Sequence, residues 1–81
     1  MRVTVRLFAA PREVLGKAQI EENVAPGSTV EELLTQLSLA FPSLTPYLGA
    51  ITVAVNQRYA DLRTELHEGD EVALVPPVGG G

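Results

Sequence analysis

Residues 28–42 read STVEELLTQLSLAFP, and this stretch decides the fold. It opens on Ser28 and Thr29, each followed three residues later by a glutamate, which is the spacing of a capping box at a helix N-terminus. Apolar side chains then recur at helical spacing, and Pro42 stops the helix after about three turns. The members of this stripe are Val30, Leu33, Leu34, Leu37, Ala40 and Phe41. The stretch predicts one amphipathic helix whose apolar stripe packs on the core.

Two strand patterns precede this helix. Residues 3–7 alternate between apolar and polar side chains, which is the pattern of a strand with one face on a core. Residues 9–16 contain Pro11 and end on a glycine, which indicates a turn or a short helical piece. A second strand is expected over residues 18–24, before a breaker formed by alanine, proline and glycine.

Two further strand patterns follow the helix. Residues 51–55 alternate as a third strand, and residues 56–59 are predicted to form a turn. The stretch up to residue 70 is expected to hold a loop or a short edge strand. Residues 71–75 form the last strand, which must end before Pro76 because proline cannot donate to a sheet ladder.

This order of elements predicts an α+β fold in which one helix crosses a single face of a sheet. We expect one domain over residues 1–75 and a C-terminal tail over residues 76–81. The parity of the first and last strands places Phe8 and Val75 on the face away from the helix, with Tyr59 at the rim of that face. Clustered exposed apolar side chains mark interfaces, whereas singly exposed ones are ordinary and need no function.

The composition limits the classes of function. With 81 residues, 46% of them hydrophobic and 20% charged, the chain has the size of one small globular domain. Its net charge of −4 and its dispersed cations argue against nucleic acid and favour an electropositive protein as partner. No stretch has the length of a membrane span and the N-terminus does not resemble a signal peptide, so we expect a cytoplasmic protein.

No self-contained active site is visible in the sequence. There is no cysteine, and no known catalytic or metal-binding motif is present, so we expect neither a bound metal nor a bound cofactor. His67 is interpreted as a surface histidine, and Glu31 and Glu32 as partners of the helix dipole. Residues 68–71 form either an acidic rim for a basic partner or a solvated turn, and the turn is the simpler interpretation.

The chain ends PPVGGG, residues 76–81. Proline fixes φ and has no N–H, so the two prolines are expected to lift the tail from the body of the protein. Glycine lacks a Cβ, so such a tail is slim enough to enter a narrow groove. The remaining chemistry is the α-carboxylate of Gly81, and we predict it to be the functional group. The alternative is an inert chain end.

Four stretches of the sequence together resemble the small subunits of molybdopterin synthase, the MoaD-type sulfur carriers. They are FAAPRE at 8–13, TVEEL at 29–33, VN at 55–56, and EGDEVA at 68–73 leading into the terminal PPVGGG. One departure is Gly79, where that family more often has another small residue. The resemblance implies a ubiquitin-like β-grasp fold, with a mixed sheet of four to five strands and one main helix packed on one face.

The resemblance also implies a chemistry for the terminus. An E1-like adenylating enzyme converts the Gly81 carboxylate to an acyl-adenylate with ATP. A sulfur donor, such as a cysteine desulfurase or a rhodanese-like protein, then displaces AMP and leaves a thiocarboxylate. The large subunit of the synthase carries the catalytic side chains, and sulfur passes there to a cyclic pyranopterin precursor during molybdenum cofactor biosynthesis. The chain alone is therefore not expected to be an enzyme.

Site residues follow from the same resemblance. Gly81 is the reactive residue, and the rest of the tail delivers it; these residues are Gly80, Gly79, Val78, Pro77 and Pro76. The expected docking face for the large subunit consists of Phe8, Tyr59 and Val75, with Arg12 at its edge.

Other functions stay open at this point. The chain could carry sulfur for thiamine, cysteine or tRNA thiolation, although the diproline and residues 8–13 favour the molybdenum branch. It could instead be a ubiquitin-like modifier whose activated Gly81 acylates lysines of target proteins. A plain interaction domain with an inert tail is the third alternative.

Overall fold

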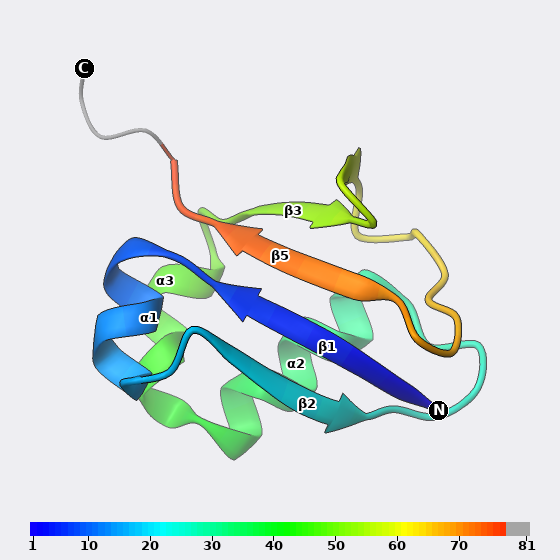
Figure 1. Ribbon diagram of the computed structural model, residues 1–81, viewed down its shortest axis with the longest axis horizontal. Coiled ribbons are helices and arrows are strands. Elements are labelled where there is room, and N and C mark those ends of the chain that lie inside the picture. Colours follow the sequence, from blue (N-terminus) through cyan, green and yellow to red (C-terminus); the bar gives the residue numbers. More distant parts are fainter. Residues whose placement is uncertain (78–81) are drawn as a thin grey trace.

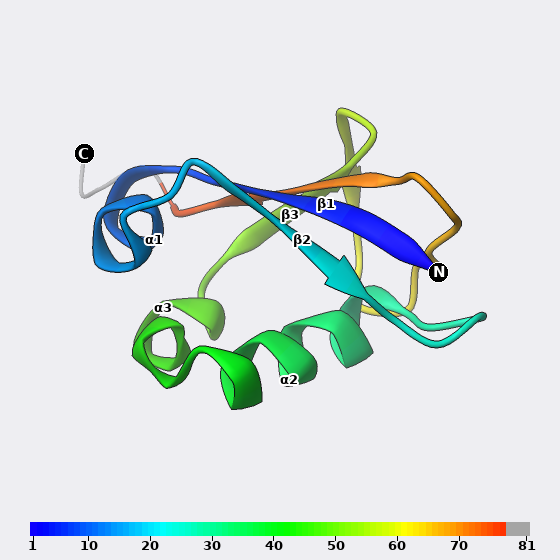
Figure 2. The same ribbon diagram turned by 60° about the horizontal axis from the view of Figure 1, so that its bottom comes forward.

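A five-stranded sheet forms one layer of the protein and helices form the other (Figures 1 and 2). The computed structural model describes residues 1–77. The strands are β1 (Arg2–Leu7), β2 (Gln19–Asn23), β3 (Thr52–Val55), β4 (Arg58–Ala60) and β5 (Glu71–Val75). The helices are α1 (Ala9–Leu15), α2 (Val30–Ala40) and α3 (Thr45–Leu48), with a 3-10 turn at Pro42–Leu44. Within residues 1–77, no helix has the length and apolar character needed to cross a membrane.

The strand order in the sheet is β2-β1-β5-β3-β4. The central pair, β1 and β5, is parallel, and the other neighbours are antiparallel. Figure 2 shows α2 and α3 on one face of this sheet. The predicted α+β class is confirmed, and so is the β-grasp arrangement of a mixed sheet with one main helix on one face. Because β1 and β5 run in the same direction, their C-terminal ends lie at the same end of the sheet.

The capping box of α2 uses Thr29 and Glu32. Thr29 Oγ1 accepts a hydrogen bond from the Glu32 N–H at 3.3 Å, and Glu32 Oε1 accepts one from the Thr29 N–H at 2.9 Å. The Ser28 hydroxyl instead donates to the Ala25 carbonyl at 2.7 Å. Of the two possible boxes in the sequence, the second therefore starts the helix.

The core lies between α2 and the inner face of the sheet. Inward side chains of β1 and β5 alternate along their strands as predicted, and α2 contributes three fully buried side chains. The buried members are Val3, Val5, Leu7, Val72 and Leu74 from the strands and Val30, Leu33 and Leu37 from the helix. The predicted helix stripe extends too far in one respect, because Ala40 in the last turn is exposed.

The connection after β3 differs from the prediction of a turn over residues 56–59. Only Asn56 and Gln57 form the turn, and Arg58–Ala60 form the edge strand β4, which pairs with β3. Both turn residues have positive φ, 51° and 69°. This is the backbone of a two-residue hairpin turn whose twist matches that of the strands, and it usually contains glycine at the second position.

We expect Gln57→Gly to raise the free energy of unfolding by about 0.5 kcal/mol. The substitution removes a Cβ from a left-handed residue, and this gain exceeds the extra conformational entropy of glycine in the unfolded chain. Urea unfolding of the two proteins measures the difference. A variant less stable than the parent would show that the Gln57 side chain contributes contacts that outweigh the backbone strain.

Candidate functional site

The face of the sheet away from α2 carries small and apolar side chains beside the charged pair of Arg6 and Glu71. Strand register places Ala73 beside Arg6 of β1 on one side and Ala54 of β3 on the other. Ala54 in turn faces Tyr59 of β4. Since Leu74 next to Ala73 is fully buried on the inner face, this row points outward. We call the group Phe8, Ala54, Tyr59, Ala73 and Val75 the outer-face band.

Phe8 and Val75 lie at one end of this band. They follow Leu7 and Leu74, which are partners in the parallel β1–β5 pair. The Phe8 backbone is extended, the residue is 39% exposed, and the Arg6 guanidinium lies 6.0 Å from the centre of its ring. The Arg6 guanidinium also lies 3.6 Å from the Glu71 carboxylate. A large aromatic ring held open to solvent beside Val75 is a suitable anchor for a protein partner.

Tyr59 lies at the other end of the band, on the edge strand β4. The order of the strands separates it from β1 by β5 and β3. The residue is 85% exposed. The register therefore places Phe8 and Val75 at neighbouring positions on the outer face and Tyr59 at the rim of that face, as the parity of the sequence indicated.

The tail leaves from the end of the sheet at which β1 and β5 terminate. Strand β5 stops at Val75, directly before Pro76, as predicted. The other predicted tail residues, Val78, Gly79, Gly80 and Gly81, lie outside the described residues. At the same end of the sheet, the chain turns from β1 into α1 (Figure 1). Ala9 lies at this turn and has a φ of 52°.

Arg12 lies on α1 and is exposed. Because α1 directly follows β1, Arg12 lies near the end of the sheet from which the tail departs. It is not part of the outer-face band. Its predicted role at the edge of a docking face stays a prediction.

Asp70 differs from the prediction of a solvated turn, because only 8% of it is exposed. Its carboxylate accepts hydrogen bonds from the Asn56 side-chain amide at 2.9 Å and from the His67 N–H at 2.8 Å. The Asn56 side-chain oxygen accepts a further bond from the Glu71 N–H at 3.0 Å. Two motifs that carry the resemblance, VN and EGDEVA, are thus joined by a structural network that fixes the start of β5 against the β3–β4 turn.

We expect Asp70→Ala to lower the free energy of unfolding by about 2 kcal/mol, because it leaves the Asn56 amide and the His67 N–H without their charged acceptor. Chemical denaturation measures the loss, and Glu68→Ala in the neighbouring exposed position is the control. Within the described part of the chain, Glu68 accepts one exposed hydrogen bond, from the Arg2 N–H at 2.9 Å, so its removal should cost much less. Equal losses in the two variants would contradict a special role for Asp70.

His67 has a side chain that is 72% exposed and lies 3.5 Å from the Glu65 carboxylate. This agrees with its interpretation as a surface histidine. Among residues 1–77, no group of three or more histidine, cysteine, aspartate or glutamate side chains is placed to hold a metal ion.

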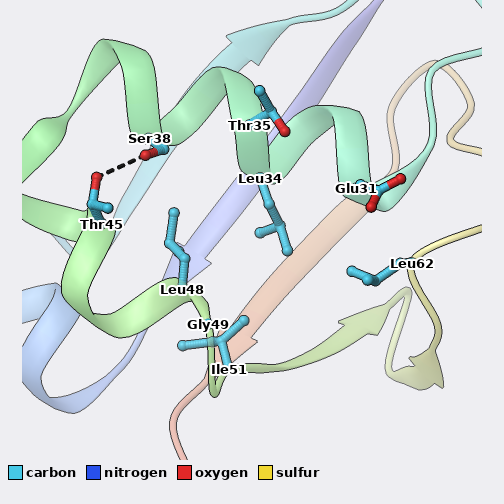
Figure 3. A pocket seen from close by; sticks show the side chains of 9 residues that line it. All are labelled: Glu31, Leu34, Thr35, Ser38, Thr45, Leu48, Gly49, Ile51 and Leu62. Atoms are coloured by element: carbon cyan, nitrogen blue, oxygen red, sulfur yellow. Dashed lines mark hydrogen bonds between the residues drawn. The ribbon is translucent and has the colours of Figure 1, made fainter.

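An open groove of about 490 Å³ lies on the helical side of the protein (Figure 3). Its apolar lining comes from Leu34, Leu48, Ile51 and Leu62. The hydroxyls of Ser38 and Thr45 bond to each other at 2.7 Å on one wall. Glu31 is the one ionisable residue among those that line it, so the lining offers no pair of groups for acid–base catalysis. No sequence pattern indicated this groove, because its walls form only when α2 packs beside α3 and the loop that carries Leu62.

Known proteins resemble this chain over its full length. The sequence matches the ThiS family over residues 5–81. It is 40% identical to the molybdopterin synthase sulfur carrier subunit of Mycobacterium tuberculosis over 82 residues, which cover 100% of this chain and 99% of that protein. It is 36% identical to the same subunit of Chlamydomonas reinhardtii over 83 residues, which cover 100% of both chains.

Solved structures agree with the sequence relatives. SAMP1 from Haloferax volcanii superimposes with a TM-score of 0.88 at 32% identity. One chain from the complex of subunits 1 and 2 of molybdopterin-converting factor from Helicobacter pylori superimposes with a TM-score of 0.74 at 30% identity. Both comparisons cover 100% of each chain. A ubiquitin from Caldiarchaeum subterraneum, with a TM-score of 0.66 at 17% identity, shares the fold. The chain therefore belongs to the ThiS family, together with the molybdopterin synthase sulfur carrier subunits.

Proposed function

We propose that this chain is the sulfur-carrying small subunit of a molybdopterin synthase. The observation that carries the proposal is the match to sulfur carrier subunits across the whole chain, which runs through the diproline and the terminal glycines. In this proposal, Gly81 carries the sulfur as a thiocarboxylate and donates it to a cyclic pyranopterin precursor.

Activation of the terminus needs a partner enzyme. A carboxylate is a poor electrophile, so its oxygen first attacks the α-phosphorus of ATP, and pyrophosphate leaves. The persulfide of a sulfur donor then attacks the carbonyl carbon of the acyl-adenylate, AMP leaves, and a thiol reduces the resulting acyl disulfide to release the thiocarboxylate. We assign the first step to an E1-like adenylating enzyme and the supply of sulfur to a cysteine desulfurase or a rhodanese-like protein. Because loading consumes ATP, we place it in the cytoplasm.

The outer-face band is the proposed docking surface for the large subunit. It offers an exposed aromatic ring at Phe8, next to Val75, and this part of the band lies at the end of the sheet from which the tail leaves. A partner that covers Phe8 and Val75 is therefore positioned to receive the tail. The similarity to the two-subunit complex of molybdopterin-converting factor supports a partner of this kind. The catalytic side chains for sulfur transfer are proposed to lie on that partner.

Intact-mass spectrometry tests the loading step. The protein is incubated with ATP, a matched adenylating enzyme and a sulfur source, and its mass is compared with that of the untreated protein. We expect replacement of one oxygen by sulfur, located at Gly81 by fragmentation. An unchanged mass, with an enzyme shown to load another carrier, would overturn the proposal.

A further inference from the structure

Arg6 is a cationic side chain in the middle of the outer face of the sheet. Strand register places it beside Ala73 of β5 on one side and Gln19 of β2 on the other. Its side chain is 46% exposed, and its guanidinium lies 6.0 Å from the centre of the Phe8 ring. A partner that covers Phe8 therefore covers part of the Arg6 guanidinium as well.

The guanidinium of Arg6 has more hydrogen-bond donors than the described chain satisfies. It carries five N–H donors and no acceptor. Glu71 is its counter-ion, but the Arg6 Nη1 and Glu71 Oε2 atoms lie 3.6 Å apart, which is too long for a hydrogen bond. Within residues 1–77, the guanidinium donates no hydrogen bond at all. Even a bidentate contact with Glu71 would use only two of the five donors, so the others depend on water in the free protein.

Binding of a partner over Phe8 removes water from these donors. A buried donor without an acceptor lowers affinity, and the loss is larger when the donor is charged. The partner therefore needs oxygen acceptors opposite Arg6. Because Glu71 already balances the charge of the guanidinium, these acceptors need not be charged. Carbonyl oxygens meet this requirement, whereas an added carboxylate would place a second negative charge next to Glu71.

We propose that the large subunit accepts hydrogen bonds from Arg6 through uncharged carbonyl oxygens, next to the site where it binds Phe8, and that Glu71 stays paired with Arg6 in the complex. The inference rests on the docking surface of the proposed function and adds the chemistry of the opposing surface. Recognition then depends on the planar fork of the guanidinium and not only on its charge. A partner that lacks acceptors at this position leaves the donors unpaired, so Arg6 contributes to the choice of partner.

Isothermal titration of Arg6→Met with the large subunit tests the contact. Methionine keeps an unbranched apolar stem and removes every donor, so we expect the affinity to fall about tenfold. Arg2→Met is the matched control, because Arg2 lies on the same strand and the same face, about 20 Å from Phe8. Arg2 also has an ion pair of its own, 3.4 Å from the Glu21 carboxylate. We expect Arg2→Met to bind like the parent, and equal losses in the two variants would overturn the inference.

Arg6→Lys separates the hydrogen-bonding fork from the charge. Lysine keeps a counter-ion for Glu71, but its ammonium group is a point charge without the planar arrangement of donors. We expect the affinity of Arg6→Lys to fall about fivefold. Parental affinity of this variant would overturn the inference, because a positive charge alone would then be sufficient. Thermal unfolding of all three arginine variants should match the parent, since exposed ion pairs contribute little to stability.

Phe8→Asp is titrated in parallel, because it separates this inference from the docking surface on which it rests. Weaker binding of Phe8→Asp together with parental affinity of Arg6→Met would overturn the inference and leave the docking surface in place. Parental affinity of both variants would contradict the docking surface, and the inference with it. Sulfur loading, followed by intact mass, tests the carrier role independently of these titrations.

Discussion

Removal of Gly81 is expected to abolish sulfur loading while leaving the protein as stable as before. The shortened chain still ends in two glycines and a carboxylate, so the chemistry of its terminus is unchanged. Its reach is shorter by one residue, about 3.5 Å, and a displacement of even 1 Å at a reacting centre costs about a hundredfold in rate. The core ends at Leu74, so thermal unfolding should not change.

Gly79→Ala is the control for this deletion, because it alters the tail without changing its length. We expect it to load sulfur, as alanine is another small residue. Intact mass after reaction measures loading, and a thermal scan measures stability. Normal loading of the shortened chain would show that tail length does not matter, and a large fall in melting temperature would show that Gly81 supports the fold.

Phe8→Asp is expected to weaken binding to the large subunit by about a hundredfold, or about 3 kcal/mol. The change removes an exposed aromatic anchor and its contact with Arg6, and it places an unpaired carboxylate where the partner would exclude water. Isothermal titration of the variant with the large subunit measures the loss. The fold should tolerate the change, because Phe8 is not part of the buried core.

Leu39→Asp is the matched control for Phe8→Asp. Leu39 lies on α2 and is 78% exposed, so the substitution adds the same charge to an apolar surface position in the helical layer. We expect its affinity to equal that of the parent. If the two variants bound equally well, the outer-face band would not be the docking surface.

Much of the fold could be predicted because local and tertiary preferences agree. The alternation of β1 and β5 and the helical spacing of α2 each matched the face that is buried. Predictions failed where tertiary contacts decide the structure. Strand β4 has three residues, too few to show a period, and Gln57 adopts a positive φ that its residue type does not indicate. Helix α3 is a single turn, too short to show helical spacing in the sequence.

The part of the candidate site that follows from the alternation of inward and outward side chains along the strands could be predicted. Phe8 and Val75 fall on the outward positions of neighbouring strands, and their pairing follows once β1 and β5 are known to be parallel. The buried role of Asp70 was not predictable from its exposed-looking neighbours, because its partner Asn56 comes from a distant turn. The one local indication of a buried role was the position of Asp70, between a glycine and the start of a strand.

A single turnover of sulfur transfer tests whether Gly81 carries the sulfur that enters the pterin. Protein carrying a Gly81 thiocarboxylate is mixed with the large subunit and the cyclic pyranopterin precursor, and both the protein and the pterin are followed by mass spectrometry. If Gly81 is the sulfur carrier, the protein returns to the carboxylate form as sulfur appears in the pterin. A thiocarboxylate that persists with an active large subunit and a sulfur-free pterin would contradict it.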